Sequence, residues 1–590
     1  MTAPMRIRQK IRLITASSPN TRLNSWKEIA AYLGRDARTV QLWEKQEELP
    51  IHRHTHQARA SVYAYSAELD AWLKMRTAEK AVRGAPQTHG DEELRTARVS
   101  GMLWRLGAVV LLLGILGTGF WFVINRKTQP KLPTGALAVL PFENLSPSED
   151  LLVDGLTDVL ITDLGRAGQI QVISRRSAMQ FKGQHLPLPQ IAAKLHASLV
   201  LEGTVTRSGN DIRVTAQLLD AVQDRPIWAA SYSRKTNDVI AFQDEIAATI
   251  ASEVTQKLTG TVPPASPASK SVDPRARLAY LTGRHFWEQR DEPGLRKAVA
   301  YFQQAATIDP HYAPAYAGLA DSYNLMAGWR VPPSGESFSR AKAAAQTALS
   351  LDPTSAEAYN SLAFATYRQD WDFNRADQYF RRAIELNPNY AVAHQWYGEF
   401  LGDMRRFDQS IAELLKAREL DPLSAMVGCD LAEGYLHAGR IAEAEAELKR
   451  VLNLYQDFAP AHAYLVGVYS KQSNFAAAES EAQAYFRHTG EESPLQMVRI
   501  QREAATGSVD QARRDVSLLL SGKSRSSFSS YQKAQFFFAS GQKEAGYAAL
   551  EEAYRERSWW LVTMLVDPGF DSVRNEHRFH DLAKRVGLPV

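Results

Sequence analysis

The sequence predicts a multidomain protein that combines a small α+β head, one transmembrane helix, an α/β sandwich domain and an all-α solenoid. Three observations lead to this prediction. An uncharged run occupies residues 106–124, strand-like and helix-like segments alternate after it, and Asp-Pro or Asn-Pro pairs then recur about every 34 residues. The predicted parts are a flexible basic arm (1–23), a head (24–80), a linker (81–105), the span (106–124), the α/β domain (134–258), a second linker (259–272), the repeats (273–560) and a C-terminal cap (561–590).

The uncharged run from Leu106 to Ile124 predicts a transmembrane helix of nineteen residues. At about 1.5 Å per residue such a helix reaches nearly across the roughly 30 Å hydrocarbon core of a bilayer. Trp104 before the run and Trp121 near its end suit the aromatic belts of the two interfaces. The run is too long for a buried helix of a soluble domain and begins too far from Met1 for a signal sequence.

Positive charge is concentrated before the predicted span. The first hundred residues contain 17 Lys and Arg against 11 Asp and Glu, whereas the whole chain carries +4. This asymmetry indicates a nucleic acid or another anionic partner for the N-terminal part. Cys429 is the single cysteine, so no intramolecular disulfide forms, and we expect it to pack as a small apolar group.

Two short helices are predicted at the start of the head. Ser25 and Glu28 have the spacing of a capping box, which begins a helix at Trp26. Gly34 supplies the left-handed residue of a tight turn, and Asp36 is placed to cap a second helix. A small residue, a glycine turn and apolar locking residues follow the spacing of helix-turn-helix domains, at Ala30, Gly34, Val40 and Trp43.

A strand pair and a third helix complete the predicted head. Alternation over residues 62–65 predicts a strand, with residues 49–53 as its antiparallel partner, and Ser66 caps the helix that follows. The stretches SWKEIAAYLG, RTVQLWE and YAYSAELDAWL resemble winged helix-turn-helix domains of the MerR and excisionase kind, over residues 24–75. The resemblance implies that the second helix reads a DNA major groove and that the strand pair, or wing, contacts the phosphate backbone or minor groove.

Candidate DNA contacts point outward from the second helix and the wing. They are Arg35, Arg38, Thr39, Gln41, Lys45, Arg53 and Arg59. Such side chains bond phosphates and base edges, so double-stranded DNA is the predicted partner of the head. The alternative is a head that binds protein, since basic residues are common on solvated surfaces. The alternating His52, His54 and His56 imitate a metal site, but no cysteine or carboxylate cluster completes one, and no cofactor is predicted.

The region from 134 to 258 predicts a mixed sheet packed with helices. The expected strands cover 136–142, 171–174, 199–207, 212–219 and 227–233, and the expected helices cover 150–166, 190–195 and 239–258. The stretches AVLPFENLS, DGLTDVLITDL and LVLEGTV are similar to the FlgO/TolB-like domain of bacterial envelope proteins, a resemblance that brings no catalytic residues. Asp154 and Asp158 form an acidic helix face, and we find no nucleophile–base pair and no phosphate loop in this predicted domain.

Helical repeats are predicted for residues 273–560. Asp309-Pro310, Asp352-Pro353, Asn387-Pro388 and Asp421-Pro422 are separated by 43, 35 and 34 residues. A 34-residue period is that of the tetratricopeptide repeat, and the region has room for about eight units. Within one unit Gly398 lets two helices cross closely and Ser410 takes the small site opposite. A protein or peptide is the expected partner on the concave surface, and a stalk or dimer contact without a ligand is the alternative.

The order of the parts resembles that of one-component membrane regulators of the CadC and ToxR type, in architecture only. The resemblance implies a transcriptional regulator in the inner membrane, single-pass, with a cytoplasmic N-terminus and a periplasmic C-terminal region, active as a homodimer. The alternative is an envelope scaffold or assembly protein whose head binds protein. An enzyme is not expected, because no region presents a catalytic constellation. Salt-dependent DNA binding by the head separates the two interpretations.

Overall fold

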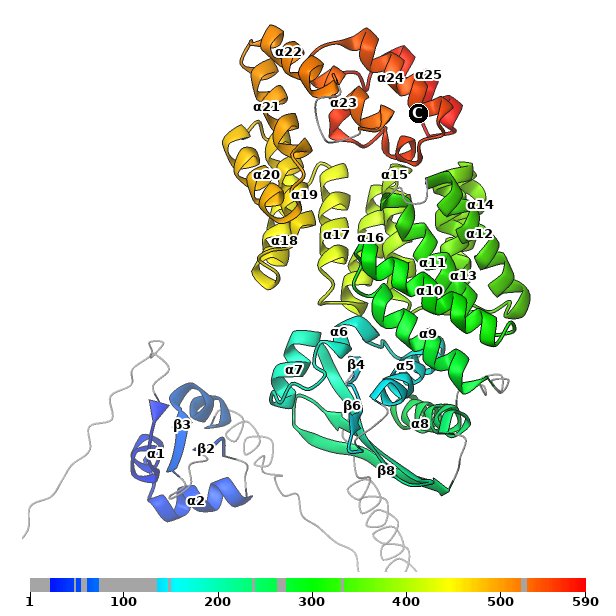
Figure 1. Ribbon diagram of the computed structural model, residues 1–590. Coiled ribbons are helices and arrows are strands. Elements are labelled where there is room, and N and C mark those ends of the chain that lie inside the picture. Colours follow the sequence, from blue (N-terminus) through cyan, green and yellow to red (C-terminus); the bar gives the residue numbers. More distant parts are fainter. Residues whose placement is uncertain are drawn as a thin grey trace, which may run out of the picture. The chain divides into compact units, whose positions relative to one another are not determined.

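The computed structural model describes residues 22–46, 49–54, 61–73, 135–146, 150–235, 239–262, 272–329, 334–521 and 528–590. They belong to two compact units, Met1–Lys127 and Thr128–Val590 (Figure 1). The predicted transmembrane helix at 106–124 and the linker at 81–105 lie outside the described residues. Within the described ranges, no helix has the length and apolar character needed to cross a bilayer.

The first unit is built from short helices and a three-stranded sheet of order β1-β3-β2, antiparallel throughout. Its elements are β1 (Arg22–Leu23), α1 (Trp26–Leu33), α2 (Ala37–Gln46), β2 (His52–His54) and β3 (Ser61–Tyr65), and residues 66–73 are helical. Apolar side chains from these helices, from β3 and from the segment between α2 and β2 meet in one core: Ile29, Ala30, Val40, Leu49, Ala64, Leu69 and Trp72.

The predicted turn between the first two helices is present. The Glu28 N–H donates to Ser25 Oγ at 3.2 Å and begins α1, and Gly34 ends it with φ +63°. The capping box differs from the prediction in one bond, because Glu28 Oε2 accepts from the Asn24 N–H at 2.8 Å rather than from that of Ser25. Asp36 caps α2 through the Thr39 N–H at 2.8 Å, as expected.

The sheet of this unit corrects two boundaries. The predicted flexible arm at 1–23 ends too late, because Arg22 and Leu23 pair with the free edge of β3 as β1, and the Arg22 guanidinium lies 4.0 Å from the ring centroid of Tyr63. The predicted strand at 49–53 begins too early, because Leu49 is buried in the core and β2 starts at His52.

A five-stranded mixed sheet opens the second unit, with order β4-β6-β7-β8 and β5 beside β6. β4 and β5 run parallel to β6, and the other pairs are antiparallel. The elements are β4 (Ala136–Val139), β5 (Glu143–Asn144), α5 (Asp150–Arg166), α6 (Arg175–Met179), α7 (Leu188–Leu195), β6 (Ala197–Ser208), β7 (Asp211–Asp220), β8 (Arg225–Lys235) and α8 (Val239–Thr259). We call this part the sheet domain.

Helices cover both faces of β4. Leu137 and Val139 pack with α5 and α8, and Ala136 and Ala138 pack with α7 on the opposite face. The continuous apolar run predicted at 136–142 is therefore buried on both sides. The predicted strand at 171–174 is reduced to a single parallel bridge between Val172 and Leu137. The outward N–H groups of Val172 and Ser174 donate to the repeats, to Asn389 Oδ1 at 2.9 Å and to the Leu420 carbonyl at 2.7 Å.

Eight antiparallel helix pairs follow in the described part of residues 272–555 (Figure 1). They are α9 (Pro274–Trp287) with α10 (Glu292–Ile308), α11 (Ala313–Trp329) with α12 (Ser334–Leu351), α13 (Ala356–Ala365) with α14 (Phe373–Leu386), α15 (Ala391–Asp403) with α16 (Phe407–Leu420), α17 (Ala425–His437) with α18 (Ile441–Leu454), α19 (Ala459–Lys471) with α20 (Phe475–Thr489), α21 (Ser493–Ala505) with α22 (Val509–Leu520), and α23 (Ser530–Ala539) with α24 (Lys543–Arg555).

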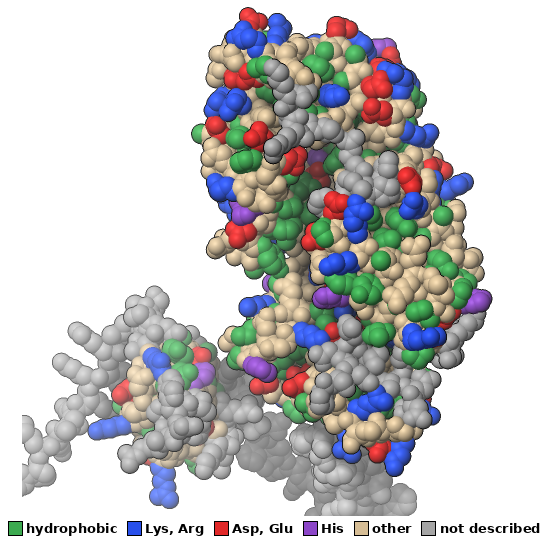
Figure 2. All heavy atoms as spheres, viewed as in Figure 1, with side chains coloured by type: hydrophobic (Ala, Val, Ile, Leu, Met, Phe, Trp, Pro, Cys, Tyr) green, Lys and Arg blue, Asp and Glu red, His purple; other side chains and the backbone are tan. Residues whose placement is uncertain are grey.

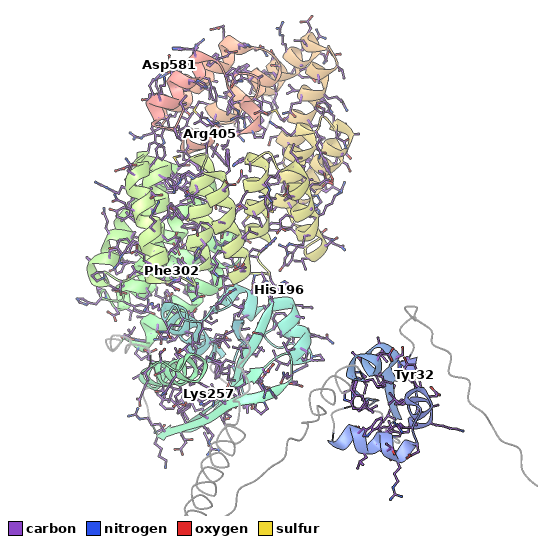
Figure 3. All side chains as sticks on the ribbon, turned by 180° about the vertical axis from the view of Figure 1, so that it is seen from behind. Tyr32, His196, Lys257, Phe302, Arg405 and Asp581 are labelled. Atoms are coloured by element: carbon purple, nitrogen blue, oxygen red, sulfur yellow. The ribbon has the colours of Figure 1, made fainter. Side chains whose placement is uncertain are left out.

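Glycines allow close packing within these pairs and between successive pairs. A Cβ on Gly283 or on Gly318 would lie 2.7 Å from the ring of Phe302, the buried aromatic of α10 labelled in Figure 3. A Cβ on Gly398 would lie 2.5 Å from Leu414 Cγ, and the Ser410 hydroxyl donates to the Gly398 carbonyl at 2.7 Å. Gly398 and Ser410 therefore allow α15 and α16 to cross closely, as the repeat spacing predicted.

The C-terminal segment folds back onto the early repeats. It contains the 3-10 helices η2 (Trp559–Thr563) and η3 (Pro568–Phe570) and the helix α25 (His577–Val586), and α13 continues into the π-helix η1 (Thr366–Asp370). Arg557 donates to the carbonyls of Gln369 and Asp370, at 2.9 Å each. One hydrophobic core joins Phe338 and Tyr367 to residues as late as Leu588. The array is therefore closed on itself between its third pair and its C-terminal end.

Candidate functional site

A cavity of about 690 Å³ lies inside the closed repeat array. The helices α15, α17 and α19, each the first of its pair, contribute to its wall together with η2. Figure 2 shows a hollow lined with hydrophobic side chains in this region. The aromatic residues of the wall are Phe364, Trp396, Phe458, Tyr464, Tyr485, Trp559 and Trp560. We call this space the interior cavity.

Four carboxylates face the interior cavity from two neighbouring helices. Glu399 and Asp403 lie one turn apart on α15, and Asp430 and Glu433 lie one turn apart on α17, which packs beside α15. Arg368 of η1 approaches the two carboxylates of α15, with nitrogens 3.4 Å from Glu399 Oε2 and 3.6 Å from Asp403 Oδ2. The second pair has neutral hydrogen-bond partners instead.

Asp430 and Glu433 lack a lysine or arginine ion-pair partner among the described residues. Gln395 Nε2 donates to Asp430 Oδ2 at 2.5 Å, and the Tyr464 hydroxyl donates to Glu433 Oε2 at 3.4 Å. His437 Nε2 is 3.8 Å from Glu433 Oε1, and burial lowers the pKa of this histidine. The second carboxylate pair thus has direct partners that are neutral, and the positive charges of Arg368 and, at Asp430, of Arg290 act on it from beyond ion-pair distance.

Burial determines the protonation of this cluster. It raises the pKa of Asp430 to about 7, with a further rise from the neighbouring Glu433, and raises the pKa of Glu433 to about 7. Burial raises the pKa of Asp403 to about 6, although Arg368 opposes the rise. The pKa of Glu399 lies well above its usual range for the same reason, with Asp430 adding to the effect. The cavity therefore disfavours its own negative charge when no cation is bound.

Four charged side chains in the wall keep buried polar atoms without a hydrogen-bond partner among the described residues: Asp403, Arg368, Arg290 at its Nε and Nη2, and Arg176 at its Nε. Asp403 is 3% exposed and its Oδ2 accepts no hydrogen bond. Arg368 is 6% exposed and its Nε and Nη1 donate none. Buried polar groups in folded proteins are normally bonded, so these atoms indicate a site that is incomplete without further polar partners.

The sheet domain forms one edge of the interior cavity. Arg176 of α6 lines the cavity and donates to Ser424 Oγ at 2.8 Å. Beside it, Arg175 pairs with Glu288 at the end of α9. A ligand in the cavity therefore touches residues of both parts of the second unit, which makes the sheet domain part of the site.

The candidate DNA-contacting residues differ in their exposure and in whether the structure describes them. Arg35, Arg38 and Gln41 are exposed, and the last two lie three residues apart on one face of α2. The Thr39 hydroxyl donates to Asp36 Oδ2 at 2.7 Å, so this side chain caps the helix. Lys45 in α2 and Arg53 in β2 have side chains outside the description, and Arg59 lies outside the described residues. Contact with DNA stays a prediction.

Of the three histidines predicted near the wing, His52 contacts other side chains of the head. His52 Nε2 lies 2.8 Å from Glu68 Oε2, and the His52 ring stacks on Tyr63 at 5.1 Å between centroids. His54 ends β2, and His56 lies outside the described residues. The described ranges contain no group of three or more histidine, cysteine or acidic side chains placed to hold a metal ion.

The carboxylates of the interior cavity were not predicted from the sequence. A usable signal exists in α15 and α17, where Glu399, Asp403, Asp430 and Glu433 interrupt helices that are otherwise rich in alanine, glycine and large apolar residues. Cys429 beside them is buried, and burial raises the pKa of its thiol, which agrees with the expected packing role.

Two family matches confirm the predicted sheet domain and repeats. The TolB amino-terminal domain family matches residues 127–227, and the tetratricopeptide repeat family matches residues 356–390. The second unit is therefore a TolB-like domain followed by a tetratricopeptide-repeat array.

Curated relatives share parts of the chain. It is 31% identical over 250 residues to the putative adenylate cyclase 3 of Rhizobium meliloti, covering 41% of this chain and 42% of that protein. It is 21% identical over 375 residues to the transcriptional regulator HilA of Salmonella typhimurium, covering 60% of this chain and 65% of that protein. The chain thus spans less than two thirds of the length of each of these relatives.

Among solved structures, PilF of Pseudomonas aeruginosa matches with a TM-score of 0.29 and 20% identity, over 38% of this chain and 97% of that chain. The type IV pilus biogenesis factor PilW matches with a TM-score of 0.30 and 22% identity, over 35% and 94%. Both TM-scores are low, and neither likeness bears on function.

Proposed function

We propose that this tetratricopeptide-repeat protein binds a segment of a protein or peptide partner in its interior cavity. The observation that carries the proposal is the cavity of about 690 Å³ between first helices of successive pairs. Helical-repeat arrays bind partners on their concave surfaces. A space of this size, with aromatic walls and a few convergent polar groups, fits a small number of side chains rather than a folded domain.

A substitution that fills the cavity tests this proposal. Peptides selected from a displayed library on the full-length chain are expected to lose affinity by about tenfold or more in Met426→Trp, because Met426 lines the cavity and the larger ring occupies the space. The control is Leu518→Trp, which places the same ring at a position 65% exposed on α22. Failure to select peptides, or equal binding by both variants and the wild type, would refute the proposal.

A second candidate function is transcription regulation through DNA binding by the head, in the manner of a winged helix-turn-helix domain. The specific observation is the exposed pair Arg38 and Gln41 on α2, a helix that follows the tight turn at Gly34. Arginine and glutamine are the side chains that bond guanine and adenine edges in the major groove. The partial similarity to the transcriptional regulator HilA supports this candidate.

For this second function we propose a location in the inner membrane. The uncharged run at 106–124 is the proposed single span, with the head in the cytoplasm where DNA is and the second unit on the periplasmic side. A homodimer of such chains would present two heads to two half-sites. Protease digestion of spheroplasts tests the orientation, because only the second unit should then be cleaved.

DNA titration separates the regulator from the scaffold. The head, residues 1–80, is titrated with labelled genomic fragments at two salt concentrations. A regulator prefers particular fragments, weakens with salt, and loses its preference in Arg38→Ala/Gln41→Ala while the exposed Lys27→Ala on α1 keeps it. Absence of binding by an artificially dimerised head would leave an envelope scaffold that binds partners through its repeats. We propose no enzymatic activity for either case.

A further inference from the structure

We propose that the interior cavity recognises a positively charged side chain, a lysine or an arginine, on the segment that it binds. The inference rests on the proposed partner binding and names the chemistry of the partner. It is carried by the charge of the wall, by the aromatic faces around it, and by an unsatisfied carboxylate oxygen.

The wall has more acidic than basic side chains: Glu288, Glu399, Asp403, Asp430 and Glu433 line it, against Arg176, Arg290 and Arg368. Arg368 is the cation that approaches Glu399 and Asp403, whereas Asp430 and Glu433 are bonded by the neutral Gln395 and Tyr464. An isolated buried carboxylate is costly, and a cation bonded to it removes most of that cost. A lysine or arginine of the partner supplies the missing charge to α17.

The aromatic walls suit a cation as well. Arg368 already lies among them, with its guanidinium carbon 5.3 Å from the ring centroid of Phe364, 4.5 Å from that of Tyr367 and 5.1 Å from that of Trp559. Cations are attracted to the faces of such rings, most strongly where water is excluded. The same kind of wall continues toward α17 through Trp396, whose ring is 4.5 Å from that of Phe364.

Asp403 Oδ2 provides an acceptor that no group of the described chain fills. Asp403 is almost completely buried, lines the cavity, and its Oδ2 accepts no hydrogen bond, because the Arg368 nitrogen at 3.6 Å is too distant. Among common side chains, lysine and arginine offer several donors together with a positive charge. A partner cation therefore completes this part of the wall.

Charge-matched peptides test the inference on the full-length chain. The probes are a labelled alanine-rich peptide with several lysines, and the same peptide with glutamine or with glutamate at each lysine. We expect the lysine peptide to bind at least about tenfold more tightly than the glutamine peptide, and the glutamate peptide to bind least. The preference should disappear in Asp430→Asn/Glu433→Gln, which keeps shape but removes charge, and should persist in Glu443→Gln, an exposed acid of α18.

The outcomes separate this inference from the proposed function. Wild-type protein that binds the glutamine peptide as tightly as the lysine peptide overturns the inference whether or not the double variant folds. Library peptides that are uncharged, yet lose affinity in Met426→Trp, overturn it while partner binding stands. A lysine preference unchanged in the folded double variant also overturns it, because the charge would then be read elsewhere.

Discussion

The Ser174 hydroxyl donates to Asp421 Oδ1 at 2.6 Å, across 247 positions in the chain. Ser177, one turn further along α6, donates to the same oxygen at 2.6 Å, and Arg176 lies 3.7 Å from the other oxygen. Asp421 belongs to an Asp-Pro pair that marks the end of a repeat in the sequence. Asp421 therefore both ends a repeat and bonds the sheet domain to the repeats, at the edge of the interior cavity.

Replacement of Asp421 is expected to loosen the sheet domain. Asp421→Ala leaves the buried Ser177 hydroxyl and the half-buried Ser174 hydroxyl without their acceptor and removes the carboxylate beside Arg176, which should lower the free energy of unfolding by about 2–4 kcal/mol. The matched control is Asp352→Ala at another Asp-Pro pair, where the carboxylate bonds to Thr354 within its own turn. Urea unfolding of the full chain measures both, and equal losses would show that the contact with the sheet domain adds nothing.

Loss of the contact between the C-terminal segment and η1 is expected to increase local hydrogen exchange. Arg557→Ala removes the two hydrogen bonds to the carbonyls of η1 and the stacking of the guanidinium on Trp371, at 4.7 Å. Hydrogen exchange is expected to rise by about tenfold in η1 and in residues 559–563, because local opening there no longer breaks these bonds. Arg555→Ala, which removes an exposed pair with Glu552, is the control. Unchanged exchange in Arg557→Ala would contradict the assigned closure.

Prediction from the sequence succeeded where the physical signal is local. A capping serine, a glycine turn and the 34-residue period act within a few residues or within one repeat, so α1, Gly34 and the helix pairs followed from their patterns. The Ser174–Asp421 contact joins residues that no local pattern relates. Asp430 was missed for a different reason, because an acid in an amphipathic helix is normally solvated and only the closure of the array places it inside.

The stability of the repeats is expected to depend on pH through Asp430 and Glu433. Burial raises the pKa of each to about 7 in the folded chain, whereas unfolded carboxyl groups titrate near about 4. Between these values the folded chain holds more protons than the unfolded chain. The stabilisation is complete below about pH 4 and is lost as the pH rises through about 7, at up to roughly 1.4 kcal/mol per pH unit for each proton.

Chemical unfolding across this range is compared with that of Asp430→Asn/Glu433→Gln, in which the dependence should flatten. The pH dependence of the unfolding free energy that remains in this variant comes from the other titratable groups near Asp430 and Glu433. Asp403, with a pKa of about 6, and Glu399, with a raised pKa, act in the same sense, whereas His437, with a lowered pKa, opposes them at low pH. Identical slopes in the wild type and the variant would show that these carboxylates are charged and solvated near neutrality.

Two helical glycines are expected to respond in opposite directions to alanine. A Cβ on Gly398 would lie 2.5 Å from Leu414 Cγ and 2.9 Å from Leu414 Cδ2, so Gly398→Ala must displace α16 and should cost about 1–3 kcal/mol. At Gly467 in α19 the nearest atom is Leu436 Cδ2 at 4.0 Å, so Gly467→Ala should stabilise by about 0.5–1 kcal/mol through reduced entropy of the unfolded chain.

A third variant identifies the cause of the loss at Gly398. Leu414→Ala removes the atoms that meet the new methyl group, so Gly398→Ala should cost less in the Leu414→Ala background than in the wild type. Thermal unfolding of the four chains of this cycle measures the coupling. Additive losses would mean that Gly398→Ala acts on the helix itself and that the predicted close crossing does not limit the packing of α15 on α16.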